Sequence, residues 1–201
     1  MIEFLIIGIT LGLSAGFSPG PLTALIISES LLYGFKNGLK VAMAPFFTDI
    51  PIVTLSLFLL TRINSNIVIS FISITGGLYL IYLSRENLFF KGYDNFDKPK
   101  KSSFTKGIIT NFLSPNPYIF WITIGGPIFL KGWDKNHIYG ITFIATFYTL
   151  LITIKLLLAY IAGNSAKYLK GKTFTNIIKF TGGLILLLGL WLLRNGILYF
   201  I

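Results

Sequence analysis

Six long stretches of apolar residues with almost no charge constrain the fold of this sequence more than any other feature. About 20 apolar residues are needed for a helix to cross the hydrocarbon core of a bilayer, and each stretch is long enough. The stretches are apolar on all faces, which predicts helices rather than the alternating strands of a membrane barrel. We therefore predict an all-α, multi-pass protein of the cell membrane, surrounded by the lipid bilayer, with six transmembrane helices near residues 4–33, 41–61, 67–84, 107–130, 138–166 and 177–199.

Charged residues make up 12% of the chain and lie mainly between these stretches. The net charge of +10 would suit a nucleic acid, but the basic residues flank apolar spans, so we expect no nucleic-acid partner. With six helices, the two termini lie on the same side of the membrane. That side carries four basic residues: Arg62, Lys131, Lys135 and Arg194. The opposite side carries twelve: Lys36, Lys40, Arg85, Lys91, Lys98, Lys100, Lys101, Lys106, Lys167, Lys170, Lys172 and Lys179. Because Lys and Arg favour the cytoplasmic side, we expect both termini to lie outside.

Several functional classes are disfavoured by what the sequence contains. There is no cysteine, which excludes disulfides and thiol redox chemistry, and the one histidine, His137, falls in a short loop. We therefore expect no metal site of the His/Cys type and no cofactor. The sequence also has no phosphate-binding glycine loop and no nucleophile constellation, so we do not expect an enzyme.

The two halves of the chain resemble each other. The motif at residues 17–21 (FSPGP) has a counterpart at 113–117 (LSPNP), and TGGL at 75–78 recurs at 181–184. We therefore divide the chain into a first three-helix repeat at 1–90, a polar cytoplasmic linker at 91–106, and a second three-helix repeat at 107–201. Because each repeat has an odd number of helices, the second copy enters the membrane inverted, which is an architecture of secondary transporters.

The Ser-Pro-x-Pro motifs should break the first and fourth helices. Each pair of prolines removes two amide donors and obstructs two carbonyls four residues earlier. We expect a half-helix to restart after each break, with free amides near Thr23 and Ala24 and near Ile119 and Phe120 directed at the midplane, where they suit a carboxylate. A packing kink is the alternative. The predicted substrate-binding residues are Ser18, Pro19, Gly20, Pro21, Thr23, Ser114, Pro115, Asn116 and Pro117.

Two charged residues fall well inside the predicted spans. Asp49 in the second helix and Lys155 in the fifth have similar depth on symmetry-related helices, so we expect them to approach each other. They form either a charge or coupling site for a proton or substrate, or a structural ion pair. Asn111 and Glu29 are secondary candidates: Asn111 could coordinate a polar ligand or satisfy backbone groups, and Glu29 could be a gate or a surface charge.

Motifs across nearly the whole chain resemble the LysE-type translocators, the lysine-exporter and homoserine/threonine-resistance family of amino-acid exporters. In the first repeat these are Ser18-Pro19-Gly20-Pro21, the loop glycines Gly34 and Gly38, and then Asp49. Asn116-Pro117 followed by Phe120-Trp121, and the stretch from Gly76 to Leu80, also match. The sequence departs from the family pattern at Thr48, Tyr118 and Lys155.

This resemblance implies a secondary transporter that exports amino acids or similar small zwitterions, coupled to the proton or another ion gradient. The alternative is a cation exporter of the same superfamily. A thiol-disulfide carrier is excluded, because Ser18 and Ser114 stand where that branch has cysteines. A non-transporting scaffold would explain the apolar spans but not the paired breaks. The expected ligand is a small molecule, and a homo-oligomer is left open.

Overall fold

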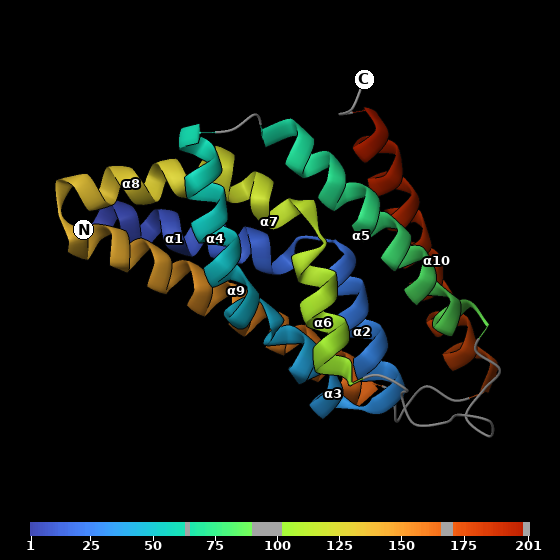
Figure 1. Ribbon diagram of the computed structural model, residues 1–201. Coiled ribbons are helices and arrows are strands. Elements are labelled where there is room, and N and C mark those ends of the chain that lie inside the picture. Colours follow the sequence, from blue (N-terminus) through green and yellow to red (C-terminus); the bar gives the residue numbers. More distant parts are fainter. Residues whose placement is uncertain (63–64, 90–101, 166–170, 199–201) are drawn as a thin grey trace.

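The computed structural model describes residues 1–62, 65–89, 102–165 and 171–198, and its regular structure in these ranges is helical, with no strand among them (Figure 1). The prediction of an all-α protein is therefore confirmed. The helices of the first half are α1 (Ile2–Phe17), α2 (Pro21–Tyr33), α3 (Phe35–Ala42), α4 (Ala44–Arg62) and α5 (Ser65–Leu88). Those of the second half are α6 (Ser103–Phe112), α7 (Pro115–Phe120), the π-helical turn η2 (Trp121–Gly125), α8 (Gly126–Lys135), α9 (His137–Ser165) and α10 (Gly171–Leu198).

A helix break falls at each Ser-Pro-x-Pro motif. The first separates α1 from α2, whose axes differ by 59°, with Gly20 extended and Pro21 as the first residue of α2. The second separates α6 from α7, which begins at Pro115. Proline lacks an amide hydrogen and is tolerated in the first turn of a helix, so both motifs end one helix and begin the next.

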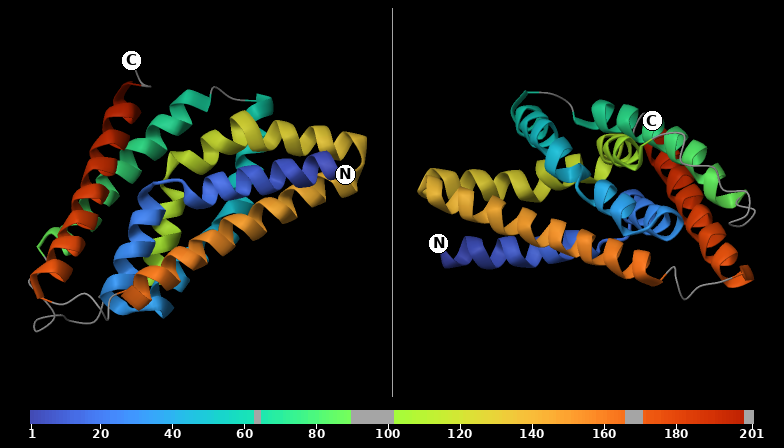
Figure 2. Two further views of the ribbon diagram at one scale, coloured as in Figure 1. Left: turned by 180° about the vertical axis from the view of Figure 1, so that it is seen from behind. Right: turned by 90° about the horizontal axis from the view of Figure 1, so that it is seen from below.

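Close packing of glycines holds α1 beside α9 (Figures 1 and 2). A Cβ atom on Gly12 would lie 2.6 Å from the carbonyl oxygen of Phe147, and one on Gly16 would lie 2.7 Å from the Cβ of Ile154. Later residues of α1 thus meet later residues of α9, and the two helices run in the same direction. Substitution of these glycines would force α1 away from α9.

Helices α5 and α10 form a second tight pair (Figures 1 and 2). The Cβ of an alanine at Gly77 would lie 2.7 Å from the carbonyl oxygen of Gly189, and Asn87 donates a hydrogen bond to Thr181. Gly182 is also packed tightly, against Asn87 and the backbone of Leu88, whereas Gly183 has no atom within 4 Å of the added carbon. The repeated Gly-Gly pairs therefore serve close packing at Gly77 and Gly182 but not at Gly183.

The segment after the first broken helix differs from our expectation. We placed Gly34 and Gly38 in a loop, but α3 forms there, and with part of α4 it gives an apolar run at Phe35–Ser56. Gly38 lies within α3, where an added Cβ would overlap the hydroxyl of Ser30. Gly34 is the residue that turns the chain, with a positive φ of 85° that favours glycine.

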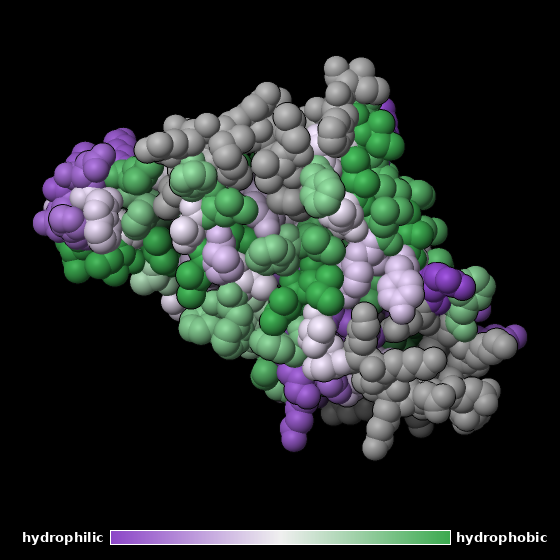
Figure 3. Space-filling view, viewed as in Figure 1, coloured by the Kyte–Doolittle hydropathy of each residue, from purple (hydrophilic) through white to green (hydrophobic). Residues whose placement is uncertain are grey.

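Three helices of the described chain are long and apolar enough to cross a membrane, or four if the bent pair α1 and α2 is one span. Large apolar side chains are exposed on the lateral surface, among them Phe46, Ile50, Phe71, Phe180 and Leu187. In Figure 3 this apolar surface separates hydrophilic patches over the far end of α8 and over α3. Such an arrangement suits a protein whose sides face lipid.

Candidate functional site

A cavity of about 450 Å³ lies where the two helix breaks meet. Most of the residues that the sequence singled out contribute to its wall: Ser18, Pro19, Gly20, Pro21, Thr23, Asp49, Asn111, Ser114, Asn116, Pro117 and Lys155. Two do not line it: Pro115 is buried at the start of α7, and Glu29 lies further along α2. The structure thus brings residues from both halves of the chain to one cavity.

The carboxylate of Asp49 lies in a polar cluster on one part of the wall. Asn111 donates to its Oδ1 at 2.8 Å, and the Tyr148 hydroxyl donates to its Oδ2 at 3.0 Å. The Thr48 hydroxyl lies 3.4 Å from Oδ1, and Asn111 also donates to that hydroxyl at 2.6 Å. A carboxylate offers about four acceptor positions. These three donors therefore orient the group without saturating it.

Lys155 anchors a second polar cluster at the first break. Its Nζ lies 2.5 Å from the Thr23 hydroxyl, which in turn donates to the carbonyl oxygen of Ser18 at 2.9 Å. That carbonyl is one of those that the break leaves without a helical partner, so Thr23 satisfies it. An ammonium group has three donors. Lys155 therefore keeps donors for a ligand in the cavity that it lines.

Asp49 and Lys155, which we expected to approach each other, line the same cavity but do not form an ion pair in the described structure. Each is 5% exposed. Asp49 is bonded to Thr48, Asn111 and Tyr148, whereas Lys155 is bonded to Thr23. Equal depth fixes the position of a residue along its helix, but the rotation of the helix decides which neighbour the side chain meets.

The half-helix amides also differ from what we expected. The amide of Ala24 donates to the carbonyl of Gly20, so the amides of α2 without an acceptor inside the helix are those of Leu22 and Thr23. At the second break α7 begins at Pro115, with Pro117 as its third residue. Because two of its first three residues are prolines, α7 has one free amide there, that of Asn116. Ile119 and Phe120, where we expected free amides, lie further along α7. The two breaks are therefore not equivalent as anion sites.

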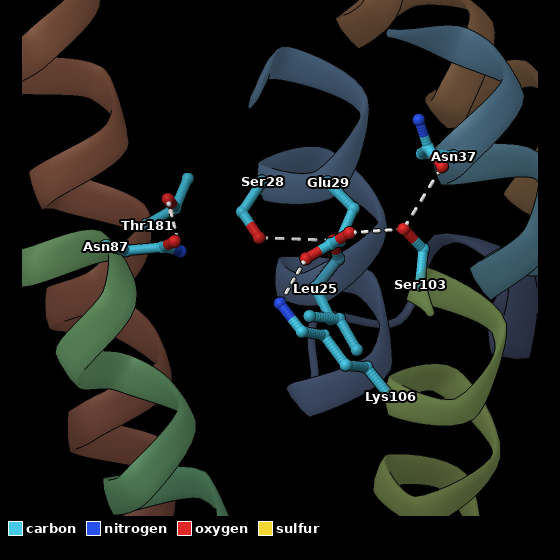
Figure 4. Close-up of polar contacts among 8 residues, drawn as sticks. All are labelled: Leu25, Ser28, Glu29, Asn37, Asn87, Ser103, Lys106 and Thr181. Carbon is cyan, nitrogen blue, oxygen red and sulfur yellow. Dashed lines mark hydrogen bonds and ion pairs between the residues drawn. The ribbon is translucent and has the colours of Figure 1, made fainter. Parts of the chain in front are cut away.

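Glu29 is neither a surface charge nor part of the cavity. It is buried, and its carboxylate forms an ion pair with Lys106 at 3.0 Å and accepts a hydrogen bond from Ser103 at 2.5 Å (Figure 4). The Ser103 hydroxyl oxygen also lies 3.3 Å from the amide oxygen of Asn37 of α3, and the Lys106 ammonium lies over the ring of Tyr33. This ion pair joins α2 to α6. Most of the predicted linker lies outside the described residues, but its end, from Ser103, belongs to α6.

Sequence reasoning missed the aromatic part of the wall. Trp121, which was not among the predicted site residues, is buried and lines the cavity beside Phe120 and Phe147. Its ring stacks on Tyr148, with centroids 6.2 Å apart, and so supports the tyrosine that donates to Asp49. The four-residue spacing of Phe147, Leu151 and Lys155 on one helix could have revealed this face, because such residues share one side of a helix.

Sequence comparison agrees with these features. The family model described as LysE type translocator matches residues 13–196, which include both breaks and every polar residue of the cavity. The chain belongs to the LysE type translocator family. It is thus a membrane protein of a family of translocators rather than enzymes, and the family that its motifs resembled is confirmed.

A bacterial relative is similar over most of its length. It is the uncharacterized membrane protein YrhP of Bacillus subtilis (strain 168), which is 30% identical over 188 residues, covering 84% of this chain and 87% of the relative. No solved structure shows significant similarity to this translocator. The residues of the cavity must therefore carry the functional argument for this member of the family.

Proposed function

We propose that this translocator is a secondary transporter that exports an amino acid or a similar small zwitterion across the cell membrane, driven by the proton or another ion gradient. The observation that carries the proposal is one cavity with an acid and a base that are not bonded to each other. Asp49 and Lys155 both face it, each fixed by neutral partners. A zwitterion has the complementary charges.

Each end of a zwitterion finds a suitable partner in this chamber. A carboxylate would bind Lys155 and the free amides at the start of α2, where the helix dipole adds favourable positive potential. An ammonium group would bind Asp49, whose acceptor positions are not all used. Binding both ends at once compensates both buried charges, which neither Asp49 nor Lys155 does for the other.

A six-span inverted repeat is part of the proposal, and reciprocal packing supports it. Helix α1 of the first span packs on α9 of the fifth, and α6 of the fourth span packs on α4 of the second. In the same way α2 packs on α10, and α7 packs on α5. Exchange of the two repeats' conformations would move the opening of the cavity from one side of the membrane to the other. We further propose, from the distribution of the basic residues, that both termini face outside.

A cation exporter is the rival function, and the charges of the cavity disfavour it. Asp49 is the one carboxylate among the described residues of the wall, and Lys155 would repel a cation from the same chamber. A divalent cation is usually bound by several oxygen ligands, and one carboxylate near an ammonium group does not provide them.

Counterflow in proteoliposomes tests the proposed function. Vesicles containing the purified protein and loaded with one unlabelled amino acid should accumulate the same labelled amino acid, and a pH gradient should change the rate. Asp49→Asn and Lys155→Met should each abolish the flux, because each leaves one end of the zwitterion without its partner. Asp134→Asn and Lys179→Met make the same chemical changes at exposed positions and should transport normally.

Two results would overturn this function. One is the absence of counterflow across a full panel of amino acids. The other is thermal stabilisation by a divalent cation that is lost in Asp49→Asn, which would favour the cation exporter.

A further inference from the structure

The wall of the cavity changes from charged to apolar along α9. Phe147, Leu151 and Lys155 succeed one another every four residues on the face that lines the chamber. At 1.5 Å per residue, the phenylalanine lies about 12 Å along the helix from the lysine. The wall next to Lys155 therefore offers Leu151 and then Phe147 to the rest of a ligand that Lys155 holds.

Two other parts of the cavity wall also change from polar to apolar in the direction from Lys155 to Phe147. On α1, which runs parallel to α9, the wall passes from Leu11 through Ser14 and Ala15, and it continues to Ser18 just after the helix ends. On α7 and η2, which run the opposite way (Figures 1 and 2), it passes from Asn116 to Phe120 and then Ile124. The cavity thus has Lys155 and the two breaks at one end and an apolar end toward the start of α1. Asp49 enters the wall from α4, where it is bonded to Asn111 and Tyr148.

We infer that the substrate is a zwitterionic amino acid with an apolar side chain, and that Leu151 and Phe147 select it. This inference rests on the proposed function and narrows its substrate class. Asp49 and Lys155 are both occupied by the α-ammonium and α-carboxylate groups, and the described residues of the apolar end include no further charged group. A basic or acidic side chain would bury an unpaired charge there, which is strongly unfavourable.

Leu151 is the residue best placed to set the size of that side chain. It lies one helical turn from Lys155, lines the cavity and is buried. Its replacement by alanine enlarges the chamber next to Lys155 without changing either charge. The position of Leu151 therefore predicts a change in the ranking of apolar substrates rather than a general loss of transport.

The experiment is self-exchange of each labelled amino acid in proteoliposomes containing the full chain. Leucine, phenylalanine, methionine and valine should exchange, whereas lysine, arginine, aspartate and glutamate should not. In Leu151→Ala the ratio of phenylalanine to valine exchange should rise by about tenfold or more, as expected for several methylene groups removed from an apolar pocket. Leu157→Ala removes the same atoms from an exposed position of α9 and should leave the ratio unchanged.

The outcomes separate the two proposals. Exchange of lysine or glutamate at the rate of leucine overturns the inference while the transport of amino acids stands. Exchange of no amino acid overturns the proposed function itself. The wild-type panel decides the substrate class even if Leu151→Ala does not fold, and an unchanged ratio in a folded Leu151→Ala protein rejects the role of Leu151.

Discussion

Removing one member of the Glu29–Lys106 ion pair should be far more damaging than removing both. Both side chains are about 2% exposed, and their charged atoms are 3.0 Å apart. At an effective dielectric constant of about 20, this separation gives an attraction of roughly 5–6 kcal/mol. Loss of one partner leaves the other charge buried without compensation, which destabilises a protein by about 3–5 kcal/mol.

The double substitution should recover most of that loss. Desolvation of two buried charges offsets much of their mutual attraction, so a neutral pair of similar volume is often as stable as the ion pair. We expect Glu29→Gln and Lys106→Met to lower the free energy of unfolding by about 3–5 kcal/mol each, and the double variant to lie within about 2 kcal/mol of the wild type. Glutamine keeps an oxygen acceptor for Ser103, so the change isolates the charge.

Reversible unfolding by SDS in mixed micelles, followed by tryptophan fluorescence, measures these free energies. Asp134→Asn and Lys131→Met alter exposed charges of α8 and should change stability by no more than about 0.5 kcal/mol. The reasoning is refuted if each single substitution at the buried pair costs less than about 1 kcal/mol, or if the double variant loses the sum of the two single losses.

Two further predictions follow from the packing and from the separate partners of the cavity charges. Gly182→Ala should destabilise the protein by about 1–3 kcal/mol, because the new Cβ meets the backbone nitrogen of Leu88 at 2.9 Å, whereas Gly183→Ala should be neutral or stabilising in the same unfolding assay. Asp49→Asn and Lys155→Met should lower folded yield additively, measured by size-exclusion chromatography, because the two residues have different partners. A double variant with near-normal yield would show that they interact after all.

The sequence predicted the helices and their breaks because these depend on local chemistry. Uncharged runs identify apolar helices, and a proline interrupts a helix wherever it stands in the interior. The residues at Ser18–Pro21 and Ser114–Pro117 could therefore be assigned to a common site before any contact was known. The helical state of α3 could not be predicted in this way, because its glycines are typical of a loop and the close packing of Gly38 against Ser30 is a tertiary contact.

The partners of the charged residues were the least predictable part. Lys106 was counted among the basic residues of a cytoplasmic loop, but α6 begins three residues earlier and carries it to Glu29. Tyr148 lies next to Phe147 in an apolar helix, and nothing in its sequence neighbourhood indicates that its hydroxyl reaches Asp49. Such pairings depend on helix rotation, which hydropathy and spacing do not specify.

The buried ion pair between α2 and α6 links any separation of these two helices to the entry of water. If the two helices separate at Glu29 and Lys106 while water enters between them, hydration replaces the attraction that is lost, and the movement requires little free energy. If the helices separate without water, two uncompensated charges face an apolar medium, and the free energy of that state is very high. Separation of α2 from α6 at this point is therefore far less costly when water enters between them than when it does not.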